Sequence, residues 1–136
     1  MIRRYLMDTG IAQDFRDNHA NVRARAKAAR ALGHRVGICI PVLGELWSGV
    51  EGSAQRNANE VLLLRALSQL SIWPYSIEAA AEYGRIFTQL KRAGTPIQQI
   101  DIQIGAIART LPNCVVVSKD SDLLVIPGLP VENWAS

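Results

Sequence analysis

Hydrophobic and polar residues follow two repeating patterns along the chain. Short apolar runs are typical of strands, whereas apolar residues spaced three or four positions apart are typical of helices. We predict strands at residues 3–7, 36–40 and 114–118, with a brief apolar run at residues 72–73. We predict helices at residues 21–32, 41–50, 54–70 and 98–109, with a further one beginning after Ser76.

Residues that favour helix ends support these boundaries. Gly33 closes one helix, Pro41 suits the first turn of the next, and Ser76 is a good N-cap. The helix after Ser76 ends in Lys91, Arg92 and Gly94, a favourable C-terminal pattern. We expect this helix to turn one set of residues toward the core: Ile77, Ala80, Ala81, Gly84, Phe87 and Leu90.

Alternating strands and helices of this length predict a parallel sheet with helices on both sides, so the fold class is α/β. The β-branched run at residues 114–118 is typical of a central strand that is buried on both faces. We find no repeat or long linker and expect a single domain spanning residues 1–136. Ligands of such folds bind beyond the carboxyl ends of the strands, where the strand order reverses.

The composition fits this picture. Of 136 residues, 49% are hydrophobic and 20% are charged, which is typical of a globular protein. Cys39 and Cys114 lie in apolar runs and are expected to be buried free thiols. No stretch approaches the roughly 20 apolar residues of a membrane span, and the chain begins with a strand pattern, so we expect a cytoplasmic protein.

The net charge is only +3, but residues 1–35 carry eight basic residues against three acidic ones. A basic face of this kind could follow a phosphate backbone, and Arg23, Arg25 and Lys27 are candidate RNA contacts. The alternative is that these residues only keep an exposed helix soluble.

Carboxylates gather at the predicted carboxyl edge of the sheet. Asp8 ends the first strand, Asp120 and Asp122 follow the strand at 114–118, and Glu45 lies just beyond the second strand. Asp101 lies in the first turn of its helix, where we expect Gly105, four residues on, to leave room beside it.

Each of these residues has a structural alternative. Asp8 could cap the helix that follows it, Asp120 could cap a short turn, and Asp101 could stabilise its own helix N-terminus. Several like charges at one sheet edge repel one another, however, and a fold tolerates them mainly to hold divalent cations. Oxygen ligands favour Mg²⁺ or Mn²⁺ over zinc.

Such ions can activate water for attack on a phosphodiester. His19 and His34 lie in the basic N-terminal region, away from the strand ends, and are expected to be surface or loop residues. Ser118 has no evident histidine partner and is better suited to orient a metal-bound water.

Taken together, these residues resemble the PIN-domain family, and within it the VapC-like toxins of toxin–antitoxin pairs. The resemblance extends over nearly the whole chain and is carried by segments at residues 5–9, 41–46, 83–84, 94–97 and 127–134, the most specific being Pro41-Val42-Leu43-Gly44-Glu45-Leu46 and the tail ending in Trp134.

The resemblance implies a three-layer α/β/α sandwich, an acidic site for Mg²⁺ or Mn²⁺, and cleavage of RNA. It also implies a homodimer and a larger complex with an antitoxin whose C-terminal segment lies across the active-site groove. Asp8, Glu45 and Asp101 match the most widely shared acids, Thr9 follows the first of them, and Asp120 and Asp122 share the fourth position.

The chain departs from the family pattern at Gly10 and Lys119, where Asn is usual, and at Leu123, where Phe is common. Lys119 brings a cation close to the acids, where it could weaken metal binding or contact a phosphate. The leading hypothesis is therefore a metal-dependent endoribonuclease toxin. The alternatives are a catalytically weak RNA-binding or repressor component, and a nuclease acting on DNA or structured junctions.

Overall fold

The computed structural model describes all residues 1–136 and contains a five-stranded sheet in which every pair of neighbouring strands is parallel. The strands, in sheet order, are β3 (Ser71–Trp73), β2 (Arg35–Cys39), β1 (Arg4–Met7), β4 (Cys114–Val117) and β5 (Val131–Glu132). The predicted α/β class, three-layer arrangement and parallel sheet are confirmed.

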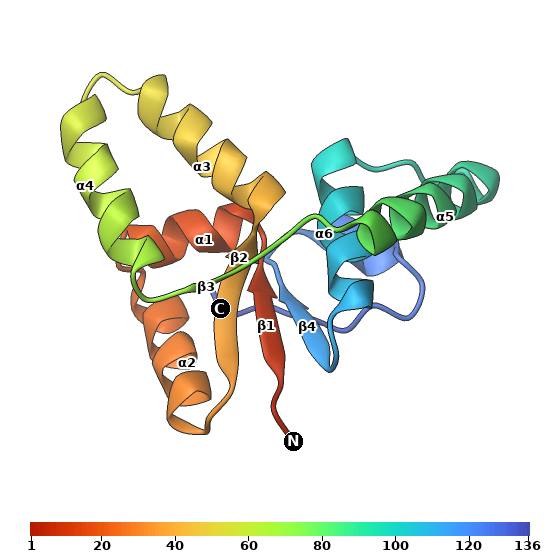
Figure 1. Cartoon of the computed structure of the whole chain (residues 1–136), viewed down its shortest axis with the longest axis horizontal. Coiled ribbons are helices and arrows are strands. Elements are labelled where there is room, and N and C mark those ends of the chain that lie inside the picture. The colour runs from red at the N-terminus through yellow and green to blue at the C-terminus, as the bar shows by residue number, and fades with distance from the viewer.

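Helices cover the two faces of this sheet (Figure 1). One group comprises α1 (Thr9–Arg16), α2 (Ala20–Ala31), α3 (Ile40–Glu51) and α4 (Arg56–Leu67). The other comprises α5 (Ile77–Ala93) and α6 (Gln99–Thr110), which pack against each other. A short 3₁₀ helix, η1 (Ser121–Val125), joins β4 to β5. None of the helices combines the length and apolar character that a membrane crossing requires.

The strand order reverses between β1 and β4. From β1 the chain moves outward to β2 and then β3, whereas the crossover through α5 and α6 returns it to the opposite side of β1. The backbone N–H of Asp8 donates to the carbonyl of Val117 (3.0 Å), which joins the carboxyl ends of these two strands. The site expected beyond the strand ends is therefore defined by the segments after β1 and β4.

A single apolar core fills the space between the sheet and the helices. Leu6, Met7, Val116 and Val117 from the two middle strands are fully buried. Both cysteines are free and buried, as expected. Burial raises the pKa of the Cys39 thiol to about 11, so this residue remains an uncharged part of the core.

The predicted helices are present with boundaries that differ by a few residues, but the expected core face of α5 is wrong except at Leu90. Ile77 is 88% exposed and Phe87 is 47% exposed, whereas Ala79, Ile86 and Leu90 are the buried residues. Apolar residues lie on more than one side of α5, so their spacing alone did not identify the packed face.

Ser76 and Gly94 cap α5 as predicted. The Ser76 hydroxyl accepts a hydrogen bond from the Ala79 N–H (3.1 Å), and Gly94 adopts the left-handed conformation that ends many helices. These caps fix where α5 begins and ends, and so fix the return of the chain toward α6.

Candidate active site

Asp8 is held at the centre of the sheet edge by its neighbours. It directly follows β1 and is only 6% exposed. Its Oδ1 accepts the Ile11 N–H (2.9 Å) and caps α1. The structural alternative for Asp8 is thus correct, and the cap uses only one of the two carboxylate oxygens.

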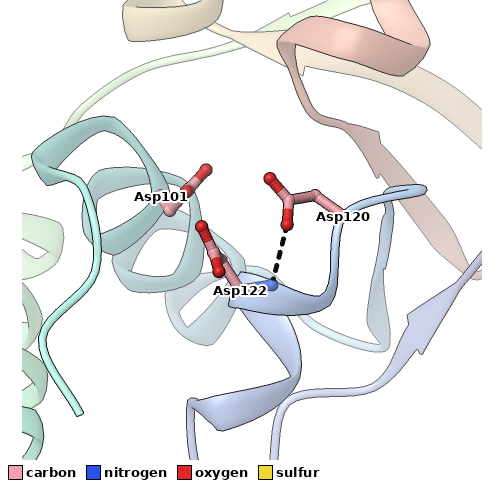
Figure 2. A group of neighbouring side chains, drawn as sticks. All are labelled: Asp101, Asp120 and Asp122. Atoms are coloured by element: carbon pink, nitrogen blue, oxygen red, sulfur yellow. Dashed lines mark hydrogen bonds between the residues drawn. The ribbon is translucent and has the colours of Figure 1, made fainter.

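The segment after β4 is organised by Ser118. This side chain is buried, and its hydroxyl accepts the N–H of Asp120 (3.0 Å). Asp120 in turn accepts the N–H of Asp122 through Oδ1 (3.0 Å), the bond drawn in Figure 2, and so caps η1. The two hydrogen bonds orient Asp120 and Asp122 toward the same side of the loop.

Asp101 approaches these residues from the first turn of α6. The expectation that Gly105 leaves room beside Asp101 is wrong. Gly105 is buried, and a Cβ at this position would lie 2.6 Å from Cδ1 of Ile126. Gly105 therefore allows α6 to pack closely against the segment after η1, and this packing positions Asp101 beside it.

Three carboxylates converge as a result. Oxygens of Asp101, Asp120 and Asp122 all lie within 4.8 Å of one another, and Figure 2 shows the side chains of Asp101 and Asp120 approaching a common space above Asp122. These residues come from α6 and from the segment after β4, which are separate elements of the fold. The convergence predicted for the sheet edge is therefore present for these three acids.

The negative charges of these neighbouring carboxylates favour the binding of protons or of a cation. The pKa of Asp101 is raised to about 6, first by burial and then by the negative charges of Asp120, Asp8 and Asp122. The pKa of Asp8 is also raised by burial, although hydrogen bonds from Ser118 and Ile11 and the charge of Lys119 oppose the shift. Either protons or a cation must compensate the repulsion between these groups.

Glu45 lies apart from the three converging carboxylates. It is exposed on α3, where it lines a groove of about 590 Å³ together with Ile100, the residue that precedes Asp101. Because Glu45 follows the second strand, the sequence predicted that it would lie at this end of the sheet. The orientation of its side chain on α3 decides that it lines the groove.

The donor set suits a hard divalent cation. Every candidate ligand is a carboxylate oxygen, which is the donor type that Mg²⁺ and Mn²⁺ prefer. The hydroxyl oxygen of Thr9, next to Asp8, is buried and has no hydrogen-bond partner within the protein. A buried hydroxyl normally has a partner, so Thr9 fits a site that is completed by an ion and its waters.

Lys119 contacts the edge of the site in a way that the sequence did not reveal. Its Nζ lies 2.8 Å from Oδ2 of Asp14, an acid that the sequence analysis did not single out. A Cβ at Gly10 would lie 3.6 Å from Cε of Lys119 and 3.8 Å from Oδ1 of Asp8. Two of the departures from the family pattern, Gly10 and Lys119, are therefore neighbours in space.

The basic residues singled out in α2 differ in their surroundings. The Arg23 guanidinium lies 3.7 Å from the centre of the Phe15 ring and donates to the Phe15 carbonyl (2.6 Å). Arg25 forms an ion pair with Glu132 (3.3 Å). Lys27 is exposed and forms no ion pair.

The histidines are loop residues outside the acidic group. His19 caps α2 by accepting the Val22 N–H (3.4 Å), and His34 accepts the Arg3 N–H (3.0 Å). Both imidazoles therefore have structural contacts near helix or strand starts, which agrees with the expectation that neither is the catalyst.

Similar proteins have been described from bacteria. The chain is 28% identical over 130 residues to "Ribonuclease VapC2" of Rickettsia felis, covering 96% of this chain and 97% of the relative. It is 32% identical over 92 residues to "tRNA(fMet)-specific endonuclease VapC" of Salmonella typhimurium, covering 68% and 70% of the two chains.

The fold is also similar to a chain in the crystal structure of VapBC2 from Rickettsia felis bound to a promoter DNA fragment. The TM-score is 0.88 at 28% identity, with 96% of this chain and 98% of the other covered. For DNA-bound VapBC from Salmonella typhimurium the TM-score is 0.87 at 27% identity, with 98% and 99% covered. The PIN domain model matches residues 5–129. With this match over most of its length and the acids placed where the strand order reverses, the chain belongs to the PIN-domain family.

Proposed function

We propose that this protein is a metal-dependent endoribonuclease and the toxin of a toxin–antitoxin pair. The observation that carries the proposal is the convergence of Asp101, Asp120 and Asp122 within 4.8 Å, with Asp8 on the adjacent strand end. The similarity to two relatives named as RNA-cleaving enzymes supports RNA as the substrate. RNA as substrate also agrees with the expected cytoplasmic location.

Asp8, Asp101, Asp120 and Asp122 would hold Mg²⁺ or Mn²⁺, with Glu45 contributing from the adjacent groove. When bound, such an ion supplies Lewis-acid stabilisation of a phosphodiester and lowers the pKa of bound water. The protein contributes fixed geometry, since the caps on α1 and η1 hold Asp8 and Asp120 before substrate arrives. The hydroxyls of Thr9 and Ser118 are suited to orient water at the same edge.

The RNA backbone requires cations outside the acidic group. Lys27 is free to contact phosphates, and Arg25 and Lys119 could exchange their exposed ion pairs for phosphate contacts at little cost. Arg23 belongs to the same proposed surface, although its guanidinium is already held by Phe15 and Gln69.

An antitoxin is the proposed protein partner, together with a homodimer of this chain and a larger assembly of the two proteins. Support comes from the two similar structures described as VapBC bound to DNA. Asp120 is exposed at the sheet edge, so an inhibitory segment could reach the substrate position.

Incubation of purified protein with RNA and either Mg²⁺ or Mn²⁺ tests the proposal. We expect cleavage by the wild type, loss of at least about 100-fold in rate for Asp8→Asn and Asp101→Asn, and little change for Asp17→Asn. Asp17 is a matched control because it is an exposed acid whose only ion pair is with Arg16.

Equal cleavage by all four proteins would contradict the assignment of this site. RNA binding without any turnover would favour the repressor-component alternative, and faster cleavage of DNA than of RNA would favour the DNA nuclease. Growth arrest on expression that disappears with Asp101→Asn would support the toxin.

A further inference from the structure

A groove beside Glu45 is lined by uncharged hydrogen-bonding groups. It lies between α3 and the start of α6 and measures about 590 Å³, within the range of about 300–1,000 Å³ common for ligand sites. Its polar lining comprises Ser48 from α3, Gln98 just before α6, and Gln99 and Gln103 from α6, in addition to Glu45.

These polar side chains have no partners within the protein. The hydrogen bonds of the structure include none from or to the side chains of Gln98, Gln99, Gln103 or Ser48. Gln69, by contrast, accepts a hydrogen bond from Arg23. Each glutamine in the groove therefore offers an amide donor and a carbonyl acceptor to a ligand.

The charge of the groove indicates which part of a nucleic acid it fits. None of its nine lining residues is basic, and Glu45 is acidic. A phosphate would be repelled by this surface, whereas the edge of a base carries the donors and acceptors that glutamine and glutamate recognise. Only two of the lining residues are hydrophobic, so the groove also lacks the apolar pockets that anchor a peptide.

We propose that this groove binds a base of single-stranded RNA next to the cleaved phosphodiester and that Gln98 and Gln103 select which base it is. The inference rests on the proposed ribonuclease function. Single strands are the form of RNA whose base edges are free for such contacts. Ile100 lines the groove and Asp101 follows it in α6, so a nucleotide bound here lies beside the acidic group.

The test compares cleavage sites in one mixture of single-stranded RNAs for wild type, Gln98→Ala and Gln103→Ala. The matched control is Gln89→Ala, which changes an exposed glutamine of α5 outside the groove. We expect the ratio of rates at preferred and disfavoured sites to fall about tenfold in the two groove variants and to stay unchanged in the control. An unchanged ratio, or an equal loss of rate at every site, would overturn the inference.

A binding experiment separates this inference from the proposed function. The Asp101→Asn protein, alone and combined with Gln98→Ala or Gln103→Ala, is used to select from a pool of randomised single-stranded RNA. Enrichment of one base that Gln103→Ala abolishes supports base selection even if the wild type cleaves no RNA. Absence of enrichment, or enrichment that survives Gln98→Ala and Gln103→Ala, overturns it. Failure of RNA cleavage alone contradicts only the enzymatic proposal.

Discussion

The ammonium group of Lys119 lies 2.8 Å from the carboxylate of Asp14, and its side chain passes over Gly10 beside Asp8. A Cβ at position 10 would be in ordinary van der Waals contact with the Lys119 side chain, at 3.6 Å from Cε. A positive charge is thus fixed at the edge of the proposed metal site, where it slightly offsets the rise that burial causes in the pKa of Asp8 and opposes the approach of a cation.

Lys119→Met is therefore expected to strengthen metal binding. The substitution keeps an apolar side chain over Gly10 but removes the charge, so the affinity for Mn²⁺ should rise a few-fold at low ionic strength. Titration calorimetry above pH 7 measures this effect without any need for catalysis. Lys91→Met, on the exposed end of α5, is the control. Equal or weaker Mn²⁺ binding by Lys119→Met would contradict this role.

The raised pKa of Asp101 predicts how metal binding depends on pH. Because its carboxyl has a pKa of about 6 in the absence of a cation, protons compete with the metal in this range. We expect Mn²⁺ affinity to fall as the pH is lowered through about 6. Affinity that stays constant from pH 8 down to about 5 would show that Asp101 is not a ligand.

The same shift predicts an effect on stability without metal. A carboxyl whose pKa is higher in the folded protein than its ordinary 3.8 favours folding while it is protonated. That contribution is present at low pH and is lost as the pH rises through about 6. The neutral variant Asp101→Asn should therefore be more stable than wild type at pH 7 and equally stable near pH 4.

The expected difference at pH 7 is modest. The gap between 3.8 and about 6 corresponds to about 3 kcal/mol, but Asp101 is partly exposed and screened by solvent, so we expect about 1 kcal/mol. Urea unfolding with chelator at the two pH values measures it. A variant that is less stable than wild type at pH 7 would indicate that the charged form makes a favourable contact.

The fold was largely predictable because its main elements are long and well marked. Ser76 and Gly94 define α5 by local chemistry, and the β-branched residues of β4 predict a buried strand without tertiary information. By contrast, no residue range was predicted for α1, and η1 and β5 were not predicted. Each is short, and β5 is only two residues that depend on pairing with Val116 and Val117.

The sequence predicted which edge of the sheet carries the acidic site, but it did not predict the individual side-chain contacts there. Strand ends predicted where Asp8 and Asp120 would lie, because parallel strands share a carboxyl edge. The partner of Lys119 could not be inferred, since Asp14 is 105 positions away in sequence. Gly105 was misjudged because its neighbour, Ile126, comes from a separate segment.

Gly37 and Gly84 form a matched pair of substitutions that tests the packing of the sheet. A Cβ at Gly37 would overlap the carbonyl group of Ser71 in the neighbouring strand β3. Since backbone would have to move, Gly37→Ala should lower the free energy of unfolding by about 3 kcal/mol. Gly84 is exposed on α5, and a Cβ there would have no other atom within 4 Å. Gly84→Ala should therefore raise the free energy of unfolding by up to about 1 kcal/mol. Similar values for both variants would contradict the close approach of β2 and β3.

Arg23 distinguishes a structural role from RNA binding within α2. Its guanidinium lies 3.7 Å from the centre of the Phe15 ring and donates to the Phe15 carbonyl and to Gln69. We expect Arg23→Met to lower the free energy of unfolding by about 1–2 kcal/mol because it removes both hydrogen bonds and the cation–π contact. Lys27→Met removes an exposed charge without such contacts and should leave stability unchanged.

For RNA affinity, we expect the larger effect from Lys27→Met and the smaller effect from Arg23→Met. The affinity for single-stranded RNA is measured at several salt concentrations on the Asp101→Asn protein carrying either substitution. It should fall more for Lys27→Met than for Arg23→Met, with a shallower salt dependence, because a free lysine can neutralise a phosphate. The contradicting result would be an Arg23→Met protein that keeps full stability but loses more RNA affinity than Lys27→Met. Arg23 would then be a phosphate contact, and its position over Phe15 would hold it ready for RNA without stabilising the fold.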